Sequence, residues 1–170
     1  MSDDQPIVGV LMGSDSDWPV MSDAAQVLTD FGIAHEVDVV SAHRMAQQAI
    51  DYSAGAAARG LKVLIAGAGG AAHLPGVLAA VTSLPVIGVP IALRYLDGMD
   101  SLLSIVQMPS GVPVATVGVG SSANAGLLAV RMLAVGDDKL REQLDRHREQ
   151  LAAGARAKGA ALREQIAGDS

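Results

Sequence analysis

Short β-branched runs alternate along this chain with longer Ala-rich segments, and this alternation constrains the fold more than any other feature. The runs are short enough to be strands, and Gly or Pro punctuates the segments between them. Pro19, for example, suits the first turn of a helix that Gly32 would end. The pattern predicts strands over 7–12, 35–40, 62–66, 85–89 and 113–119, and helices over 19–31, 45–59, 74–81, 99–107 and 123–134.

The order of these elements indicates a parallel sheet with helices on both faces. Most of the predicted strands are continuously apolar, as strands buried on both faces are, whereas 35–40 alternates polar and apolar residues like an edge strand. With right-handed crossovers, the expected fold is α/β, a three-layer α/β/α domain with a flavodoxin-like parallel sheet.

The C-terminal part of the chain differs in composition. Charged residues are concentrated in 137–170, where leucines and an isoleucine recur at helical spacing, which predicts one long amphipathic helix. We expect an α/β catalytic domain over 1–136 and a helical arm of the same domain over 137–170. The arm is either a solvated surface helix or, as we favour, a helix that packs on a neighbouring subunit. The apolar positions are Leu140, Leu144, Leu151, Leu162 and Ile166.

Composition excludes several classes of function. Four aromatic residues, 12 Lys and Arg, and a formal charge of −6 favour neither a base-stacking platform nor a basic nucleic-acid surface. The absence of cysteine excludes disulfides, thiol nucleophiles and thiolate metal sites, and no His or carboxylate pair has the spacing of metal ligands. The uncharged stretch 63–93 is broken by three prolines and a histidine, so buried strands explain it better than a membrane span. We expect a soluble, cytoplasmic protein.

Polar or Gly-rich clusters follow three of the predicted strands, and parallel strands bring such ends to one edge of the sheet, where ligands bind. The first cluster spans 13–19, and its Ser14, Ser16 and Asp17 suit either a phosphate and ribose or ordinary helix capping. The second contains Ser41, His43 and Arg44. A guanidinium binds phosphate or carboxylate, and an imidazole exchanges protons near neutral pH.

The third cluster, 67–76, is rich in glycine. Gly67, Gly69 and Ala72 match the G-x-G-x-x-A dinucleotide fingerprint, but no carboxylate follows the next strand to hold a ribose. The glycines instead permit close approach of backbone N–H groups to a ligand.

Together, the segments 13–18, 41–44, 67–76 and 100–109 resemble the N5-carboxyaminoimidazole ribonucleotide mutases of purine (IMP) biosynthesis, over roughly residues 7–135. The sequence departs from that family's pattern at Met45–Ala46 and at 92–95. The resemblance implies an isomerase that moves a carboxylate from the exocyclic nitrogen of the ribonucleotide to a ring carbon, without metal, organic cofactor or ATP. It also implies a homo-octamer with sites near subunit boundaries.

Carried over residue by residue, the resemblance implies that His43 is the general acid and base. Asp17 would hold the ribose, Arg44, Ser41 and Ser16 the phosphate, and Ser14 another part of the substrate. The backbone between 67 and 73 would confine CO2 and the carboxylate, with His73 completing the wall. The binding residues expected from this segment are Gly67, Ala68, Gly69, Gly70, His73 and Leu74.

Two other functions stay open at this point. One is the related aminoimidazole ribonucleotide carboxylase, which would join CO2 to the ribonucleotide directly. The other is a non-catalytic flavodoxin-like module that binds a nucleotide without turnover, because this architecture hosts many functions.

Overall fold

The computed structural model describes residues 5–168. By its packing, the chain divides into two compact units, one that ends at Met132 and one that begins at Leu133. The expected domain boundary after residue 136 stays a prediction. Its outer limits, residues 1–4 and 169–170, lie outside the described part of the chain.

The first unit is built on a five-stranded parallel sheet in the order β2-β1-β3-β4-β5. This is the flavodoxin-like order, so the predicted fold class is confirmed. The polar-apolar alternation of 35–40 also marked the correct strand as an edge. The strands are β1 (Val8–Met12), β2 (His35–Val39), β3 (Val63–Gly69), β4 (Val86–Ile91) and β5 (Ala115–Thr116).

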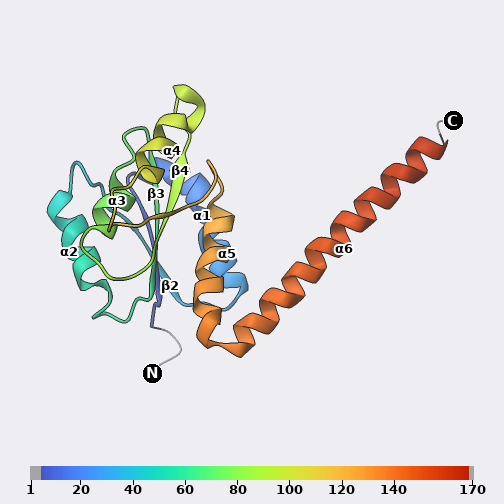
Figure 1. Cartoon of the computed structure of the whole chain (residues 1–170), viewed down its shortest axis with the longest axis horizontal. Coiled ribbons are helices and arrows are strands. Elements are labelled where there is room, and N and C mark those ends of the chain that lie inside the picture. Colours follow the sequence, from blue (N-terminus) through green and yellow to red (C-terminus); the bar gives the residue numbers. More distant parts are fainter. Residues whose placement is uncertain (1–4, 169–170) are drawn as a thin grey trace. The chain divides into compact units, whose positions relative to one another are not determined.

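Helices cover both faces of this sheet, with α2 and α3 on one side and α1 and α5 on the other (Figure 1). On the latter side, the Ser122 hydroxyl donates a hydrogen bond to the Val20 carbonyl and so ties α5 to α1. The α-helices of this unit are α1 (Trp18–Asp30), α2 (Ala46–Ala56), α3 (Leu74–Ala79), α4 (Met99–Val106) and α5 (Ser122–Leu133). Single 3-10 turns lie at η1 (Asp15–Asp17) and η2 (Leu96–Gly98) in this unit, and η3 (Ala134–Gly136) lies in the second unit.

Two predicted strands have different lengths in the structure. The strand expected over 113–119 has only two residues, because Pro113 cannot donate to the ladder and the chain beyond Thr116 keeps only isolated hydrogen bonds to β4. Conversely, β3 runs three residues past its predicted end at 66. Its glycines stay in the strand because neighbouring side chains, such as Met21 over Gly67, fill the space above them.

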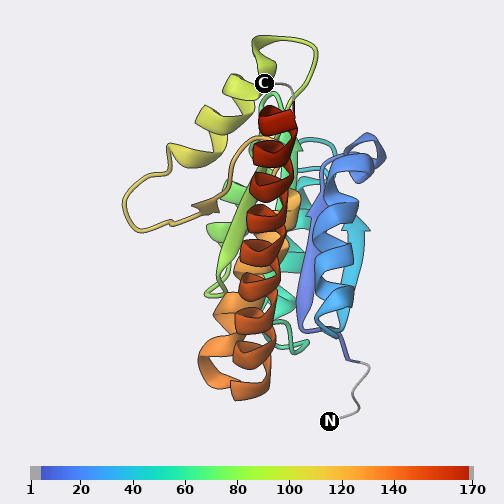
Figure 2. The same ribbon diagram turned by 90° about the vertical axis from the view of Figure 1, so that its right-hand side faces the viewer.

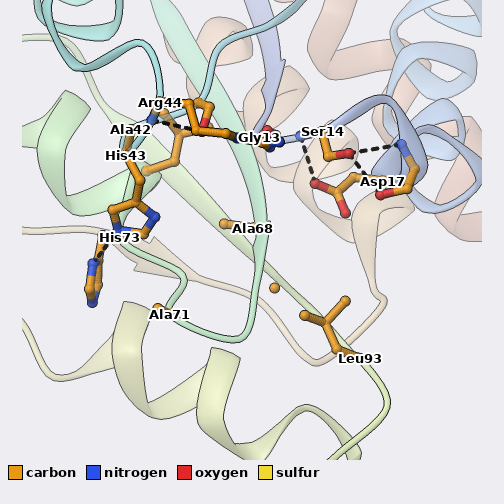
Figure 3. A pocket seen from close by; sticks show the side chains of 14 residues that line it. Gly13, Ser14, Asp17, Ala42, His43, Arg44, Ala68, Ala71, His73 and Leu93 are labelled. Atoms are coloured by element: carbon orange, nitrogen blue, oxygen red, sulfur yellow. Dashed lines mark hydrogen bonds between the residues drawn. The ribbon is translucent and has the colours of Figure 1, made fainter.

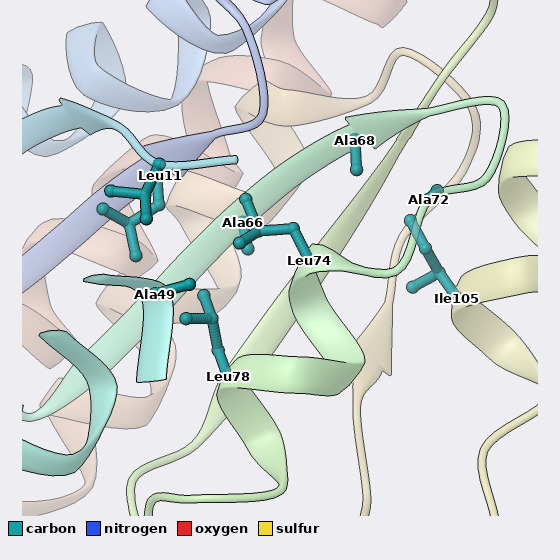
Figure 4. Packing of buried hydrophobic residues seen from close by; sticks show 9 residues of the cluster. Leu11, Ala49, Ala66, Ala68, Ala72, Leu74, Leu78 and Ile105 are labelled. Atoms are coloured by element: carbon teal, nitrogen blue, oxygen red, sulfur yellow. The ribbon is translucent and has the colours of Figure 1, made fainter. Parts of the chain in front are cut away.

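Small side chains let the helices approach the sheet closely. One buried cluster joins β1, α2, β3, α3 and α4 through Leu11, Ala49, Ala66, Leu78 and Ile105 (Figure 4). Each of these five side chains is fully buried. The alanine-rich sequence therefore forms a thin, close-packed layer rather than a bulky aromatic core.

The second unit consists mainly of α6 (Asp138–Gly168), one uninterrupted helix of 31 residues (Figure 2, red). No residue of this helix is buried, and Leu151, Leu162 and Ile166 are more than half exposed. The long helix predicted from the sequence is confirmed, and three of its five predicted apolar positions are exposed in the single chain, whereas Leu140 and Leu144 are half-buried.

Candidate active site

A cavity of about 420 Å³ opens at the carboxyl edge of the sheet, where β1, β2, β3 and β4 end. This volume suits a small-molecule ligand. Each of the three clusters predicted from the sequence contributes residues to its lining (Figure 3). The lining includes these predicted residues: Ser14, Ser16, Asp17, Ser41, His43, Arg44, Ala68, Gly69, His73 and Leu74.

The turn after β1 is shaped by reciprocal capping between Ser14 and Asp17. The Ser14 N–H donates to Asp17 Oδ2 at 3.1 Å, while Ser14 Oγ accepts from the Ser16 N–H at 3.3 Å. These bonds form a capping box around η1. The capping interpretation of this segment is therefore confirmed, and the same residues also line the cavity.

The Asp17 side chain is only 6% exposed although it carries a carboxyl group. Burial raises the pKa of the Asp17 carboxyl above its ordinary value of 3.8, while hydrogen bonds from the Ser14 and Gly13 backbone oppose that rise. A carboxylate held in this way is oriented before any ligand arrives, which suits it to accept ligand hydroxyl groups.

The loop after β2 is tied to the loop after β1 through Arg44. Its Nε donates to Ser41 Oγ at 3.2 Å, and its Nη2 donates to the Gly13 carbonyl at 3.1 Å. Ser41 itself is buried. These bonds hold a guanidinium at the rim of the cavity, where it can also bind an anionic group.

His43 and His73 meet in the cavity although thirty residues separate them. Nε2 of His43 lies 2.7 Å from Nδ1 of His73, and the two rings are nearly perpendicular (Figure 3). Such a bond requires one nitrogen to carry a proton and the other to offer a lone pair. The sequence suggested His73 only as part of a wall, whereas the structure makes it the hydrogen-bond partner of His43.

The Gly-rich segment contributes unevenly to the cavity. Ala68 and Gly69 are among its lining residues, but Gly67 and Gly70 are not. Gly67 faces Met21 in the layer below, and the Gly70 N–H donates to Ser101 Oγ at 2.8 Å. The N–H group of Gly70 is therefore already paired within the protein, and the role expected of this backbone segment stays a prediction.

Sequence reasoning missed Leu93, which lines the cavity from the chain that leaves β4. Its segment drew notice only as a departure from the family pattern. The usable signal was its position, because Leu93 follows a fourth strand end at the same edge of the sheet. Gly13, Ala42 and Ala71 complete the lining.

Within residues 5–168, no three His, Asp or Glu side chains are grouped so that they could hold a metal ion. No helix in the same part of the chain is both long and apolar enough to cross a membrane.

Comparison with known proteins agrees with this site. The family model for AIR carboxylase matches residues 7–154. N5-carboxyaminoimidazole ribonucleotide mutase of Mycobacterium tuberculosis is 61% identical over 165 residues, which cover 97% of this chain and 94% of that protein. The chloroplastic phosphoribosylaminoimidazole carboxylase of Vigna aconitifolia is 57% identical over 143 residues, 84% of this chain but 26% of that protein.

The solved structures agree as well. PurE of Treponema denticola superimposes with a TM-score of 0.80 at 28% identity, and the match covers 88% of this chain and 94% of that one.

The sequence matches differ in how much of each relative they cover. The mycobacterial mutase matches almost end to end, whereas the plant carboxylase matches over about a quarter of its length. The chain therefore belongs to the AIR carboxylase family and, within it, to the N5-carboxyaminoimidazole ribonucleotide mutases.

Proposed function

We propose that this protein converts N5-carboxyaminoimidazole ribonucleotide into 4-carboxy-5-aminoimidazole ribonucleotide, a step of de novo purine biosynthesis. The observation that carries the proposal is the pairing of His43 with His73 in a cavity whose rim holds Arg44 and Asp17. The name shared by relatives at 51–61% identity supports the same reaction.

The substrate's polar groups would be distributed around this cavity. Arg44, with Ser41 and Ser16, would bind the phosphate, because a guanidinium and hydroxyl groups complement its oxygens. The Asp17 carboxylate would accept hydrogen bonds from the ribose hydroxyl groups, and Ser14 would line the same end. Ala68, Gly69, His73 and Leu74 would enclose the imidazole and its carboxylate, while Gly67 and Gly70 would shape the wall from behind.

His43 would act first as an acid and then as a base. As the N–CO2 bond breaks, His43 donates a proton to the departing exocyclic nitrogen. The released CO2 then forms a bond with the ring carbon, and His43 removes the proton that this carbon carried. One proton leaves His43 and one returns, so the enzyme ends each turnover in its starting state. The residues around the cavity would keep CO2 beside its target, so that capture is oriented rather than diffusional.

The experiment that tests this function is a turnover assay on the purified full-length protein without ATP or added metal. Conversion of the N5-carboxylated ribonucleotide to the ring-carboxylated isomer is expected. A strong preference for aminoimidazole ribonucleotide plus bicarbonate would favour the carboxylase instead. Ligand binding without turnover of either substrate would favour the non-catalytic module.

The role of His43 is tested by His43→Asn, which keeps a similar size but cannot exchange a proton near neutral pH. Loss of general acid-base catalysis typically costs about 100- to 10,000-fold in rate, so kcat should fall by this order while the protein stays folded. Near-normal kcat in this variant would remove His43 from the mechanism.

The assembly and location of the protein extend the proposal. We infer a cytoplasmic homo-octamer in which α6 packs on a neighbouring subunit. The exposed Leu151, Leu162 and Ile166 of α6 support this packing, because a second copy would remove their apolar surface from water. Sedimentation of the full-length protein measures the assembly state.

A further inference from the structure

The register between β3 and β4 predicts one more backbone hydrogen bond at the end of their ladder than the two strands form. The Leu64 N–H donates to the Pro85 carbonyl, and Leu64 is paired with Val86. Parallel pairing repeats this bond every second residue, at positions 66, 68 and 70 of the strand. The register pairs Gly69 with Ile91, so the next bond would run from the Gly70 N–H to the Ile91 carbonyl.

The hydroxyl group of Ser101, on α4, lies at this point between the two strands. Ser101 Oγ accepts from the Gly70 N–H at 2.8 Å and donates to the Ile91 carbonyl at 2.7 Å. Ser101 is fully buried, so no water competes for these bonds. The side chain therefore bridges the donor and the acceptor that would otherwise meet directly at the ends of the two strands.

Both chains that leave this point form walls of the cavity. Gly70 adopts a positive φ of 65°, and three residues later His73 reaches His43. After Ile91 the other chain reaches Leu93, which also lines the cavity. The adjacent Ser104 hydroxyl lies 3.4 Å from the Gly70 carbonyl, so α4 contacts both polar groups of this glycine. The helix thus holds the turn that carries His73.

We propose that Ser101 is a positioning residue of the mutase reaction. Its hydroxyl separates the ends of β3 and β4, and so places His73 on one wall of the cavity and Leu93 on the other around the carboxylate that is transferred. This inference rests on the proposed function. Ser101 acts through Gly70 and Ile91 and does not line the cavity itself. Without its hydroxyl, the Gly70 N–H and the Ile91 carbonyl can pair directly, which draws the two walls together.

The test compares two variants with a matched control in the full-length protein. Ser101→Ala removes the hydroxyl, and Ser101→Cys keeps nearly the same volume with a much weaker hydrogen-bonding group. Ser53→Ala is the control, because the Ser53 hydroxyl is equally buried and donates to a backbone carbonyl, that of Leu78, away from the cavity. For each protein, kcat, KM, the melting temperature and the share of substrate released as aminoimidazole ribonucleotide and CO2 are measured.

Both Ser101 variants should lose roughly 10- to 100-fold in kcat, the order expected when reacting groups shift by about 1 Å. KM should change less, and the released share should rise because CO2 is less well confined. Ser53→Ala should lower the melting temperature by a similar amount but keep the wild-type kcat and released share. Ser101 variants that match Ser53→Ala in kcat and in the released share would overturn the proposal. If Ser101→Ala does not fold, the result of Ser101→Cys is used for this comparison.

Hydrogen–deuterium exchange separates this inference from the proposed function. The Gly70 amide should be protected in the wild-type protein and should stay protected in Ser101→Ala, where it pairs with the Ile91 carbonyl. Rapid exchange of the wild-type Gly70 amide would refute the Ser101 bridge whatever the activity. A wild-type protein that turns over neither substrate would refute the proposed function and leave the bridge to be judged by exchange alone.

Discussion

The substitution Gly67→Ala adds a single methyl group at a crowded point of the sheet. Gly67 lies in β3, paired with Met12 on one side and Val89 on the other. A Cβ atom there would lie 2.3 Å from Sδ and 2.9 Å from Cγ of Met21. Met21 is fully buried, so its side chain cannot move into solvent to make room.

The expected cost follows from this overlap. Adding a methylene-sized group to a well-packed core typically destabilises a protein by about 1–3 kcal/mol. For a chain of this length, each 1 kcal/mol lowers the melting temperature by roughly 2–4 °C. We therefore expect Gly67→Ala to lower the melting temperature by roughly 2–12 °C, and the urea midpoint to fall with an unchanged m-value.

Urea denaturation at one fixed protein concentration measures this effect, since assembly makes apparent stability depend on concentration. Gly55→Ala in α2 is the control, because a Cβ there meets no atom within 4 Å. That variant should be as stable as the wild type or more stable by about 0.5–1 kcal/mol, since alanine is the better helix former.

A double-mutant cycle with Met21→Ala identifies the cause. Met21→Ala alone should cost about 2–5 kcal/mol by opening a cavity. In the double variant, the added methyl group enters that space. The loss of stability of the double variant should therefore be smaller than the sum of the two single losses by about 0.5–3 kcal/mol. A Gly67→Ala midpoint at or above the wild-type value, or strictly additive costs, would refute the packing argument.

Three further outcomes are expected. Asp17→Asn should keep or raise the melting temperature at pH 7, because it removes a carboxylate whose pKa is raised by burial. The same variant should raise KM roughly 10- to 150-fold, because the substrate loses a charged hydrogen-bond acceptor. An unchanged KM would remove Asp17 from substrate binding. A hydrogen bond from Arg59 lowers the pKa of the Glu36 carboxyl below its ordinary value of 4.5, so this pair stabilises the fold above that pH and the contribution is lost as pH falls through the lowered pKa. Glu36→Gln should thus be less stable than the wild type at pH 7 by no more than about 1 kcal/mol, because Arg59 is nearly half exposed, and thermal melts should show this difference closing below pH 4. Combined Leu151→Lys and Leu162→Lys should yield a smaller assembly in sedimentation; an unchanged sedimentation coefficient would place the apolar side of α6 outside any subunit interface.

Most of the fold was predictable because its signals are local. Apolar runs identified four of the strands and polar-apolar alternation the fifth, β2, and the prolines and glycines at helix ends located the helices within a few residues. The two errors in strand length have different causes. β3 continues through its glycines because Met21, from a distant helix, packs over Gly67. β5 is short because Pro113 cannot donate to the ladder and the chain beyond Thr116 keeps only isolated hydrogen bonds to β4.

The site was predictable to the extent that parallel strands bring their carboxyl ends to one edge. That rule alone brought Asp17, Arg44 and His43 into one cavity, although they follow two different strands. It did not predict which polar groups already have partners. The Gly70 N–H appears available in the sequence, whereas the fold pairs it with Ser101, thirty-one residues away.

The sequence by itself thus determined the architecture, the edge where a ligand binds and the residue types at that edge, since strand periodicity and turn chemistry act over a few neighbouring residues. Only the tertiary structure decided that His43 and His73 share a hydrogen bond, that Gly67 faces the core, and that Ser101 separates two strand ends. Each of these depends on the register between elements far apart in the chain, and local sequence patterns do not encode the atomic distances that such a register creates.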